Sequence, residues 1–161
     1  MKELILLRHA KSSWEYKTDD RNRPLSERGI KRIKKVALES SRVFSSADII
    51  FSSPANRACH TASILINTLD LSFQKMSIIE DLYTFEISQL IKFIKSIPNK
   101  YRCVVCVGHN PAFSNGIEYF TSKSFDHLPT SGWAQIKFNQ NKWNLVQNGS
   151  VNYGMPKDIL K

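Results

Sequence analysis

The stretch Arg102-Cys-Val-Val-Cys-Val-Gly-His-Asn-Pro111 joins a run of apolar residues directly to a polar turn. A short, continuous apolar run bounded by turn residues is typical of a strand that is buried on both faces, as in a parallel sheet. The turn then supplies Pro111 for the first turn of a helix, so we expect a helix over residues 111–120. This order of buried strand, polar turn and helix start predicts an α/β fold.

The same order recurs twice in the first half of the chain. Residues 2–7 are predicted to form a buried strand that stops at Arg8-His9, and residues 48–51 form another that stops before Ser53-Pro54. There Ser53 can cap a helix and Pro54 can occupy its first turn. The other predicted elements are a helix that Ser26 caps and that runs to Glu39, a helix over 86–97, and strands over 75–79, 133–138 and 143–146, the last two paired as a hairpin across 139–142.

Strands that alternate with helices indicate a three-layer α/β sandwich, in which helices cover both faces of a mainly parallel central sheet. Hydrophobic residues make up 42% of the 161 residues and charged residues 23%, a balance that supports a folded core. The sequence contains no internal repeat, low-complexity segment or linker. Residues 1–161 are therefore expected to form a single domain.

The apolar runs are all short. None approaches the ~20 residues that span a bilayer, and residues 4–7 are too few for the core of a signal peptide. We therefore expect a cytoplasmic protein with no membrane partner.

The net charge is +9, and the densest basic cluster is the segment 28–35. Its basic residues alternate with Ile30, Ile33 and Val36 at helical spacing, so the cluster is interpreted as the solvated face of an amphipathic helix. No nucleic-acid-binding motif accompanies it, and no nucleic-acid partner is expected. A basic field also attracts anionic substrates, phosphate included.

Cys103 and Cys106 have the CxxC spacing of some metal and redox sites. They lie inside the predicted buried strand, where cysteine acts as a small hydrophobic residue, and no second CxxC pair completes a zinc site. The apolar interpretation is favoured, and no metal is expected.

Arginine and histidine residues follow three of the predicted strands. Arg8 and His9 end the first, Arg57 follows the second, and His109 follows the strand over 102–107. Sites in α/β sheets form at the carboxyl ends of strands, and guanidinium groups match phosphate oxygens in bidentate fashion. Taken singly, each of these residues also has a purely structural explanation: it could end a strand, lie on the surface of a helix or belong to a turn. Together they predict a phosphate site.

Five sequence motifs contain these residues or follow them in order: Leu6-Leu-Arg-His-Ala-Lys11, Asp20-Arg-Asn-Arg-Pro-Leu-Ser-Glu-Arg-Gly29, Ser52-Ser-Pro-Ala-Asn-Arg-Ala-Cys-His-Thr-Ala62, Val107-Gly-His-Asn-Pro111 and Leu128-Pro-Thr-Ser-Gly132. With these motifs the chain resembles the histidine phosphatase superfamily, also called the phosphoglycerate mutase-like fold, and within it the short phosphohistidine phosphatases of the SixA type. The usual first motif has Gly where Ala10 stands, and the SixA type often accepts Ala. The resemblance covers nearly the whole chain.

The resemblance implies a role for each matched residue. His9 would be the nucleophile that takes the phosphoryl group as phosphohistidine. Arg8 and Arg57 would clamp the phosphoryl oxygens, and His109 would donate to the same group as charge builds up. Arg23 is a candidate for a further phosphate or substrate contact. No cofactor and no metal is implied.

A proton donor is not defined by the motifs. Many family members place a Glu or Asp after the third strand to protonate the leaving oxygen, and here Glu80 and Asp81 are available. The alternative is that both belong to an ordinary acidic turn and that a dedicated acid is absent. His60 and His127 lie outside the motifs and are interpreted as structural or surface residues.

The chain is short for this fold and leaves little room for insertions that enclose a small metabolite. An open site suits a phosphorylated protein side chain. The expected function is therefore that of a monomeric, metal-independent phosphatase that acts on phosphohistidine in a phosphorelay or phosphotransfer protein. The alternatives are a phosphomonoesterase acting on a small phosphorylated metabolite, and a non-catalytic module of the same fold that binds phosphate or protein.

Overall fold

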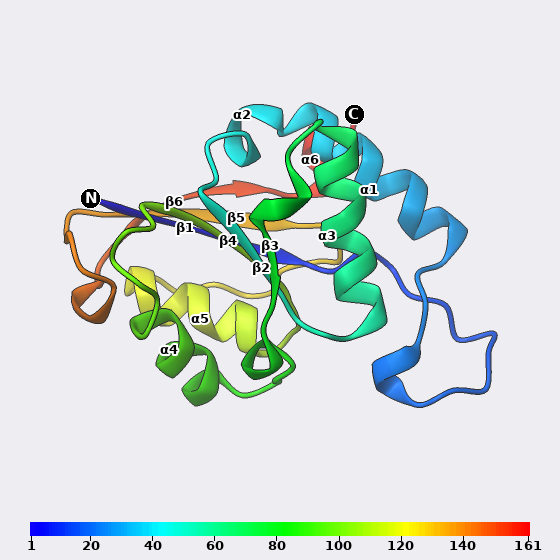
Figure 1. Cartoon of the computed structure of the whole chain (residues 1–161), viewed down its shortest axis with the longest axis horizontal. Helices are drawn as coiled ribbons and strands as arrows, with labels where there is room; N and C mark the ends of the chain where they lie inside the picture. Colours follow the sequence, from blue (N-terminus) through cyan, green and yellow to red (C-terminus); the bar gives the residue numbers. More distant parts are fainter.

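The computed structural model describes residues 1–161 and confirms the three-layer α/β architecture (Figure 1). One six-stranded sheet has the order β3-β2-β4-β1-β5-β6. Its strands run parallel except β5, which is antiparallel to both of its neighbours. The strands are β1 (Lys2–Arg8), β2 (Ile49–Ser52), β3 (Met76–Ile78), β4 (Cys103–Gly108), β5 (Trp133–Phe138) and β6 (Ser150–Gly154).

The helices lie on both faces of this sheet (Figure 1). One face carries α1 (Glu27–Glu39), α2 (Ser41–Phe44), α3 (Asn56–Thr68) and α6 (Pro156–Ile159), and the other carries α4 (Ile87–Lys95) and α5 (Ala112–Thr121). Short 3-10 helices occupy Asp20–Asn22, Phe73–Lys75, Glu80–Leu82 and Trp143–Leu145. None of the helices is both long enough and apolar enough to cross a membrane.

The start of α1 follows the sequence prediction. Ser26 is the N-cap, and its hydroxyl oxygen accepts a hydrogen bond of 3.0 Å from the backbone N–H of Gly29. Ile33 and Val36 are buried, whereas the lysines of the segment 28–35 are exposed, as an amphipathic surface helix requires.

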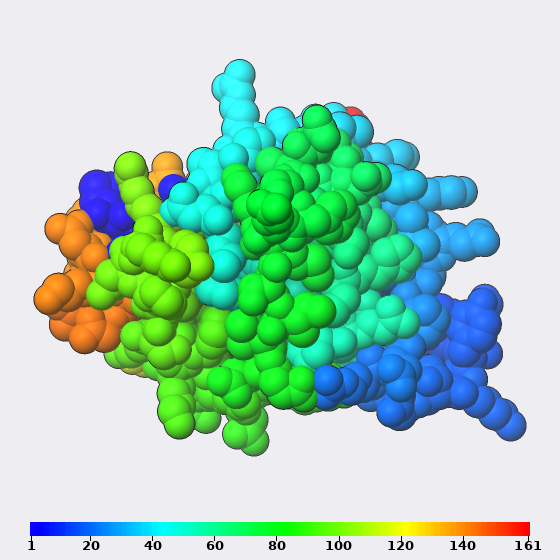
Figure 2. All heavy atoms as spheres, in the orientation of Figure 1, coloured from blue at the N-terminus to red at the C-terminus, as the bar shows by residue number.

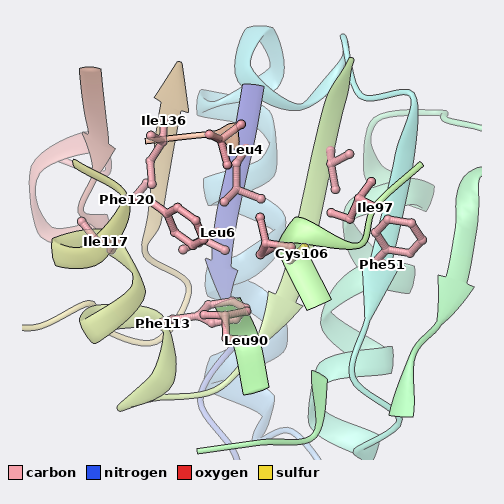
Figure 3. Close-up of a cluster of buried hydrophobic side chains, with 14 of the residues drawn as sticks. Leu4, Leu6, Phe51, Leu90, Ile97, Cys106, Phe113, Ile117, Phe120 and Ile136 are labelled. Atoms are coloured by element: carbon pink, nitrogen blue, oxygen red, sulfur yellow. The ribbon is translucent and has the colours of Figure 1, made fainter. Parts of the chain in front are cut away.

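The central strands are apolar throughout because both faces of the sheet are covered. Leu4 and Leu6 of β1 point into one cluster of 20 buried residues, next to α4 and α5 (Figure 3). Ile5 and Leu7 point into a second cluster of 20 residues, beneath α1 and α3. Burial of each such side chain stabilises the fold by about 1.5–3 kcal/mol. This explains why the strand pattern is a continuous run rather than an alternation.

Cys103 and Cys106 belong to opposite faces of β4. Cys103 lies in the cluster beneath α1 and α3, and Cys106 lies in the cluster next to α4 and α5. Burial raises the pKa of both thiols, that of Cys103 to about 12. The two side chains therefore pack as small apolar residues and cannot act as a pair.

The prediction of a strand over 143–146 is wrong. Trp143 lies in a 3-10 helix and is fully buried, with its indole Nε1 donating to the carbonyl oxygen of Tyr101 at 2.9 Å. It packs under the α4 and α5 side of the core rather than in the sheet. The partner of β5 is β6, whose Gly154 lies opposite Trp133. A Cβ atom at position 154 would lie 2.0 Å from the Trp133 ring, so only glycine fits there.

Candidate active site

A cleft of about 240 Å³ opens at the carboxyl edge of the parallel strands. It collects residues from the ends of β1 and β4, from the first turn of α3 and from the loop between β1 and α1. Its lining residues are Arg8, His9, Ser12, Trp14, Asp20, Arg23, Arg57, Phe85, His109 and Asn110. The structure thus brings together the two histidines and three arginines that the motifs single out.

His9 is buried directly after β1, with 6% of its surface exposed. Its Nδ1 lies 2.7 Å from the carbonyl oxygen of Ala10, so Nδ1 carries the proton that it donates to this acceptor. Burial lowers the pKa of His9 to about 3, against the opposing effect of the Ala10 carbonyl and with a smaller contribution from Arg57. The ring is therefore neutral near pH 7, with a lone pair on Nε2.

Arg57 lies at the centre of the cleft and is 1% exposed. Its Nε donates to His9 Nε2 at 3.3 Å, and its Nη2 lies 3.4 Å from His109 Nδ1. On its other side, Nη1 donates to the carbonyl oxygen of Asp20 at 2.6 Å and Nη2 donates to the Asp20 carboxylate at 3.0 Å. One guanidinium group thus connects both histidines to the loop before α1.

His109 directly follows β4, and its ring centre lies 5.3 Å from that of His9. Its Nε2 lies 2.8 Å from Ser53 Oγ. Burial lowers the pKa of His109 to about 3, and His9 and Arg57 act in the same direction. His109 is therefore also neutral in the free protein.

The predicted capping role of Ser53 is wrong. The helix α3 begins at Asn56, two residues after Pro54, and its N-cap is Ala55, which provides no side-chain hydrogen bond. Ser53 instead holds the His109 ring in place, because its hydroxyl is that ring's hydrogen-bond partner.

Arg8 extends from the last position of β1 to the mouth of the cleft. Its Nη1 donates to the carbonyl oxygen of Leu128 at 3.0 Å and lies 3.3 Å from His127 Nε2, while its Nε is buried without a hydrogen-bond partner. His127 is exposed, as predicted, yet it contacts a cleft residue. His60 is half-buried on α3 and does not line the cleft.

Asp20 is a charged cleft residue that the sequence analysis missed. Its carboxylate accepts hydrogen bonds from Arg57 at 3.0 Å, from Arg23 at 3.1 Å and from the Tyr83 hydroxyl at 2.6 Å. Burial acts to raise the pKa of Asp20, but the hydrogen bonds from Tyr83, Arg57 and Arg23 outweigh it and hold the pKa well below its usual range. Its position three residues before Arg23, inside the second motif, was the available signal.

Arg23 is held against the same carboxylate and against Trp14. Its guanidinium carbon lies 3.8 Å from the centre of the Trp14 ring, a cation–π contact, and its Nη1 also bonds to the hydroxyl of Ser12. Arg23 is thereby placed inside the cleft, and its Nε is buried without a partner.

Asp20→Asn should lower the melting temperature at pH 7, because the ionised carboxylate that pairs with two arginines is lost. A depressed carboxyl pKa contributes stability above the unfolded pKa, near 4, and loses it as the pH falls through the folded value. The difference from wild type should thus be constant from pH 7 to about pH 5 and shrink below about pH 4. Thermal melts over this pH range test the prediction, with Asp81→Asn as the matched control. A difference in melting temperature that stays the same at every pH would contradict the prediction.

The two candidate proton donors lie outside the cleft. The Glu80 side chain is 68% exposed and forms a bidentate pair with Arg21, with distances of 2.5 and 2.9 Å. This pairing lowers the pKa of Glu80. Asp81 is exposed, and neither residue lines the cleft.

Comparisons with known proteins place this chain in a family. The sequence model of the histidine phosphatase superfamily, branch 1, matches residues 4–92. The chain belongs to the histidine phosphatase superfamily. An uncharacterized chloroplastic protein of Arabidopsis thaliana is 29% identical over 152 residues, which cover 88% of this chain and 69% of that protein.

Solved structures of this superfamily share the fold. A protein histidine phosphatase SixA in complex with tungstate aligns with a TM-score of 0.82 and 17% identity, over 99% of both chains. A protein described as phosphohistidine phosphatase SixA from Agrobacterium tumefaciens aligns with a TM-score of 0.76 and 23% identity, over 96% of this chain and 99% of that one. The predicted SixA-type fold is confirmed. Phosphatases named for small metabolites share it as well.

Proposed function

We propose that this protein is a phosphatase that hydrolyses phosphohistidine in a phosphorelay or phosphotransfer protein. The observation that carries this proposal is a neutral histidine among arginines, in a cleft whose only carboxylate is tied to those arginines. Such a cleft can bind and transfer a phosphoryl group. It offers no acid positioned to protonate a poor leaving group.

The first chemical step is attack by His9. The Nε2 lone pair forms a bond to phosphorus, while the bond from phosphorus to the substrate imidazole nitrogen breaks and that nitrogen keeps the electron pair. The substrate ring already carries a proton on its other nitrogen, so it departs as neutral imidazole and the leaving nitrogen needs no proton. In the second step a water molecule attacks phosphorus, the bond to Nε2 breaks, and inorganic phosphate leaves with His9 restored.

Arginine residues would bind the oxygens through both steps. Arg57 Nε already donates to Nε2, the attacking atom, so a phosphoryl group bound there would meet the Arg57 guanidinium directly. Arg8 brings an unpartnered Nε to the same cleft. Charge-assisted, bidentate hydrogen bonds of this kind stabilise the negative charge that builds up in the transition state.

His109 would become a donor only when substrate is bound. In the free protein its neutral ring faces Arg57 with an unprotonated Nδ1. A phosphoryl dianion nearby favours the protonated imidazolium, because opposite charges raise a histidine pKa. The protonated ring could then donate to a phosphoryl oxygen.

Glu80→Gln and Asp81→Asn should leave phosphohistidine hydrolysis nearly unchanged. Imidazole protonates near neutral pH, with a free pKa of about 6.5, and so departs without an enzyme acid. A serine alkoxide instead needs a positioned donor, typically worth ~10²–10⁴-fold. Initial rates on a phosphohistidine protein and on a phosphoserine peptide test this. Strong hydrolysis of the peptide that is lost in one of these variants would reveal a general acid and contradict the proposal.

EDTA should leave the activity unchanged. Arginine side chains provide the positive charge in the cleft, and nowhere does the fold gather three or more His, Cys, Asp or Glu side chains able to hold a metal. The measurement is the rate of p-nitrophenyl phosphate hydrolysis after dialysis against EDTA, with and without added Mg²⁺ or Zn²⁺. A loss of activity that one of these ions restores would contradict metal independence.

One panel of substrates decides between the proposal and its rivals. It contains a phosphohistidine protein, a phosphoserine peptide, p-nitrophenyl phosphate and sugar phosphates. The proposal predicts the highest kcat/KM on the phosphohistidine protein. A preference for a sugar phosphate would favour a metabolite phosphatase, and phosphate binding without turnover would favour a non-catalytic module.

A further inference from the structure

A basic groove lies on the surface between α1 and α6. It has a volume of about 570 Å³, and Glu27 is the only acidic residue in its lining. The basic residues that line it are Arg28, Lys31, Arg32, Lys35 and Lys157. Figure 2 shows long side chains from the α1 part of the chain projecting from the edge of the molecule. None of these residues lines the catalytic cleft.

A second, more apolar hollow of about 690 Å³ adjoins the basic groove. Phe125 and Tyr153 stack in it with ring centres 5.0 Å apart, next to Met155. Arg32 and Lys157 line both hollows, so the two form one continuous surface. The acids Asp126 and Asp158 balance the charge on the second hollow.

The second hollow reaches the catalytic cleft through His127. This side chain lines the hollow, and its Nε2 lies 3.3 Å from Nη1 of Arg8, which lines the cleft. The backbone beside it also connects the two, because Pro129 lines the hollow while the carbonyl oxygen of Leu128 accepts from Arg8. A molecule seated on the two hollows would therefore reach the mouth of the cleft.

We propose that this continuous surface, from His127 across the apolar hollow to the basic groove, docks an acidic face of the phosphorylated protein substrate. The inference rests on the proposed function and extends it to the choice of partner. Acidic side chains of the partner would pair with the basic groove, and its apolar side chains would cover the stacked rings. Complementary charge of this kind mainly accelerates association and selects the partner.

Arg32 supplies a specific donor at the junction of the two hollows. Its Nε is buried and has no hydrogen-bond partner. Buried N–H groups in folded proteins are nearly always paired, so this Nε would gain a partner only if the half-buried Arg32 side chain turned toward a carboxylate of the docked protein.

A protein fits this surface better than a nucleic acid. The aromatic rings that could stack with bases are already stacked on each other, and they share the hollow with Asp126 and Asp158, whose charge repels a phosphate backbone. The basic groove itself contains no aromatic side chain.

The test compares two charge-reversal variants that change the net charge equally. Lys31→Glu/Lys35→Glu alters the basic groove, and Lys92→Glu/Lys142→Glu alters exposed lysines outside both hollows. The substrates are an acidic histidine-containing phosphotransfer protein phosphorylated with phosphoramidate, free phosphohistidine and p-nitrophenyl phosphate. Each kcat/KM is measured from low to physiological salt. If the melting temperature of Lys31→Glu/Lys35→Glu shows that this variant is unfolded, Lys31→Ala/Lys35→Ala is used in its place.

We expect the groove variant to lose about tenfold or more in kcat/KM on the phosphoprotein at low salt, with a weaker salt dependence. Its rates on the two small substrates should equal those of wild type, and the control variant should match wild type on all three. Equal rates for both variants on the phosphoprotein would overturn the docking surface and leave the phosphatase function standing. A wild type that hydrolyses only small phosphates would overturn both proposals. If duplex DNA inhibits hydrolysis of the phosphoprotein by wild type but not by the groove variant, the surface binds nucleic acid instead.

Discussion

His9→Ala should abolish turnover of every phosphorylated substrate and should also abolish covalent labelling. Rapid quench with a labelled substrate should trap a phosphoryl group on the wild-type protein that is stable in alkali and labile in acid, as a phosphoramidate bond is. The variant has no nitrogen at the position of Nε2, which lies 3.3 Å from Arg57 Nε, so no such bond can form.

The same experiment needs a control for folding. His60→Ala removes a histidine from α3 that does not line the cleft, and it should retain wild-type rates and labelling. Far-UV circular dichroism of His9→Ala should match wild type. Turnover at the wild-type rate by His9→Ala would exclude His9 as the nucleophile, and a label that persists in the variant would place the intermediate on another side chain.

The pH profile gives a second readout of the same residue. Because burial lowers the pKa of His9 to about 3, its protonation should not reduce kcat/KM between pH 8 and about pH 5. A free histidine would begin to lose its lone pair near pH 6.5. A fall in kcat/KM on p-nitrophenyl phosphate centred at the free value would show that the ring is solvated when substrate binds.

The architecture was predictable because the strongest signals in this chain are short buried strands followed by polar turns. The run that became β4 is apolar on both faces, since helices cover both sides of the sheet. Histidine and arginine residues at the strand ends then meet at one edge. The meeting of His9, Arg57 and His109 followed from topology alone, without any knowledge of side-chain positions.

The features that the sequence did not predict depend on contacts between residues far apart in the chain, which a local sequence pattern does not reveal. The strand β6 is short and largely polar, and its pairing depends on the fit of Gly154 against Trp133. Ser53 has the sequence position of a helix cap, yet its hydroxyl bonds to the buried ring of His109. Asp20 joins the site only because the loop before α1 folds back over α3.

Arg57→Lys should reduce kcat on a phosphohistidine protein by about 10²–10³-fold, the range found when a donor to transition-state charge is removed. Lysine keeps the positive charge but presents a single ammonium group. It cannot donate to His9 Nε2, to the Asp20 carbonyl and to a phosphoryl oxygen from one planar fork. The matched control is Arg21→Lys, because Arg21 pairs with the exposed Glu80 and should be replaceable without loss of kcat.

Arg57→Lys should also lower the stability of the fold, so its effect on kcat has to be measured separately from its effect on folding. Arg57 is among the largest fully buried side chains, and a shorter side chain loses its hydrogen bonds to the carbonyl oxygen and the carboxylate of Asp20. A hydrogen bond to a charged group contributes about 1.5–3 kcal/mol, so the melting temperature should fall. Kinetics below the variant's melting transition separate the two, since a folded Arg57→Lys should retain the low kcat while its KM changes much less. Recovery of wild-type kcat once the variant is fully folded would make Arg57 a structural residue, and the transition-state charge would then have to be bound by Arg8 and Arg23.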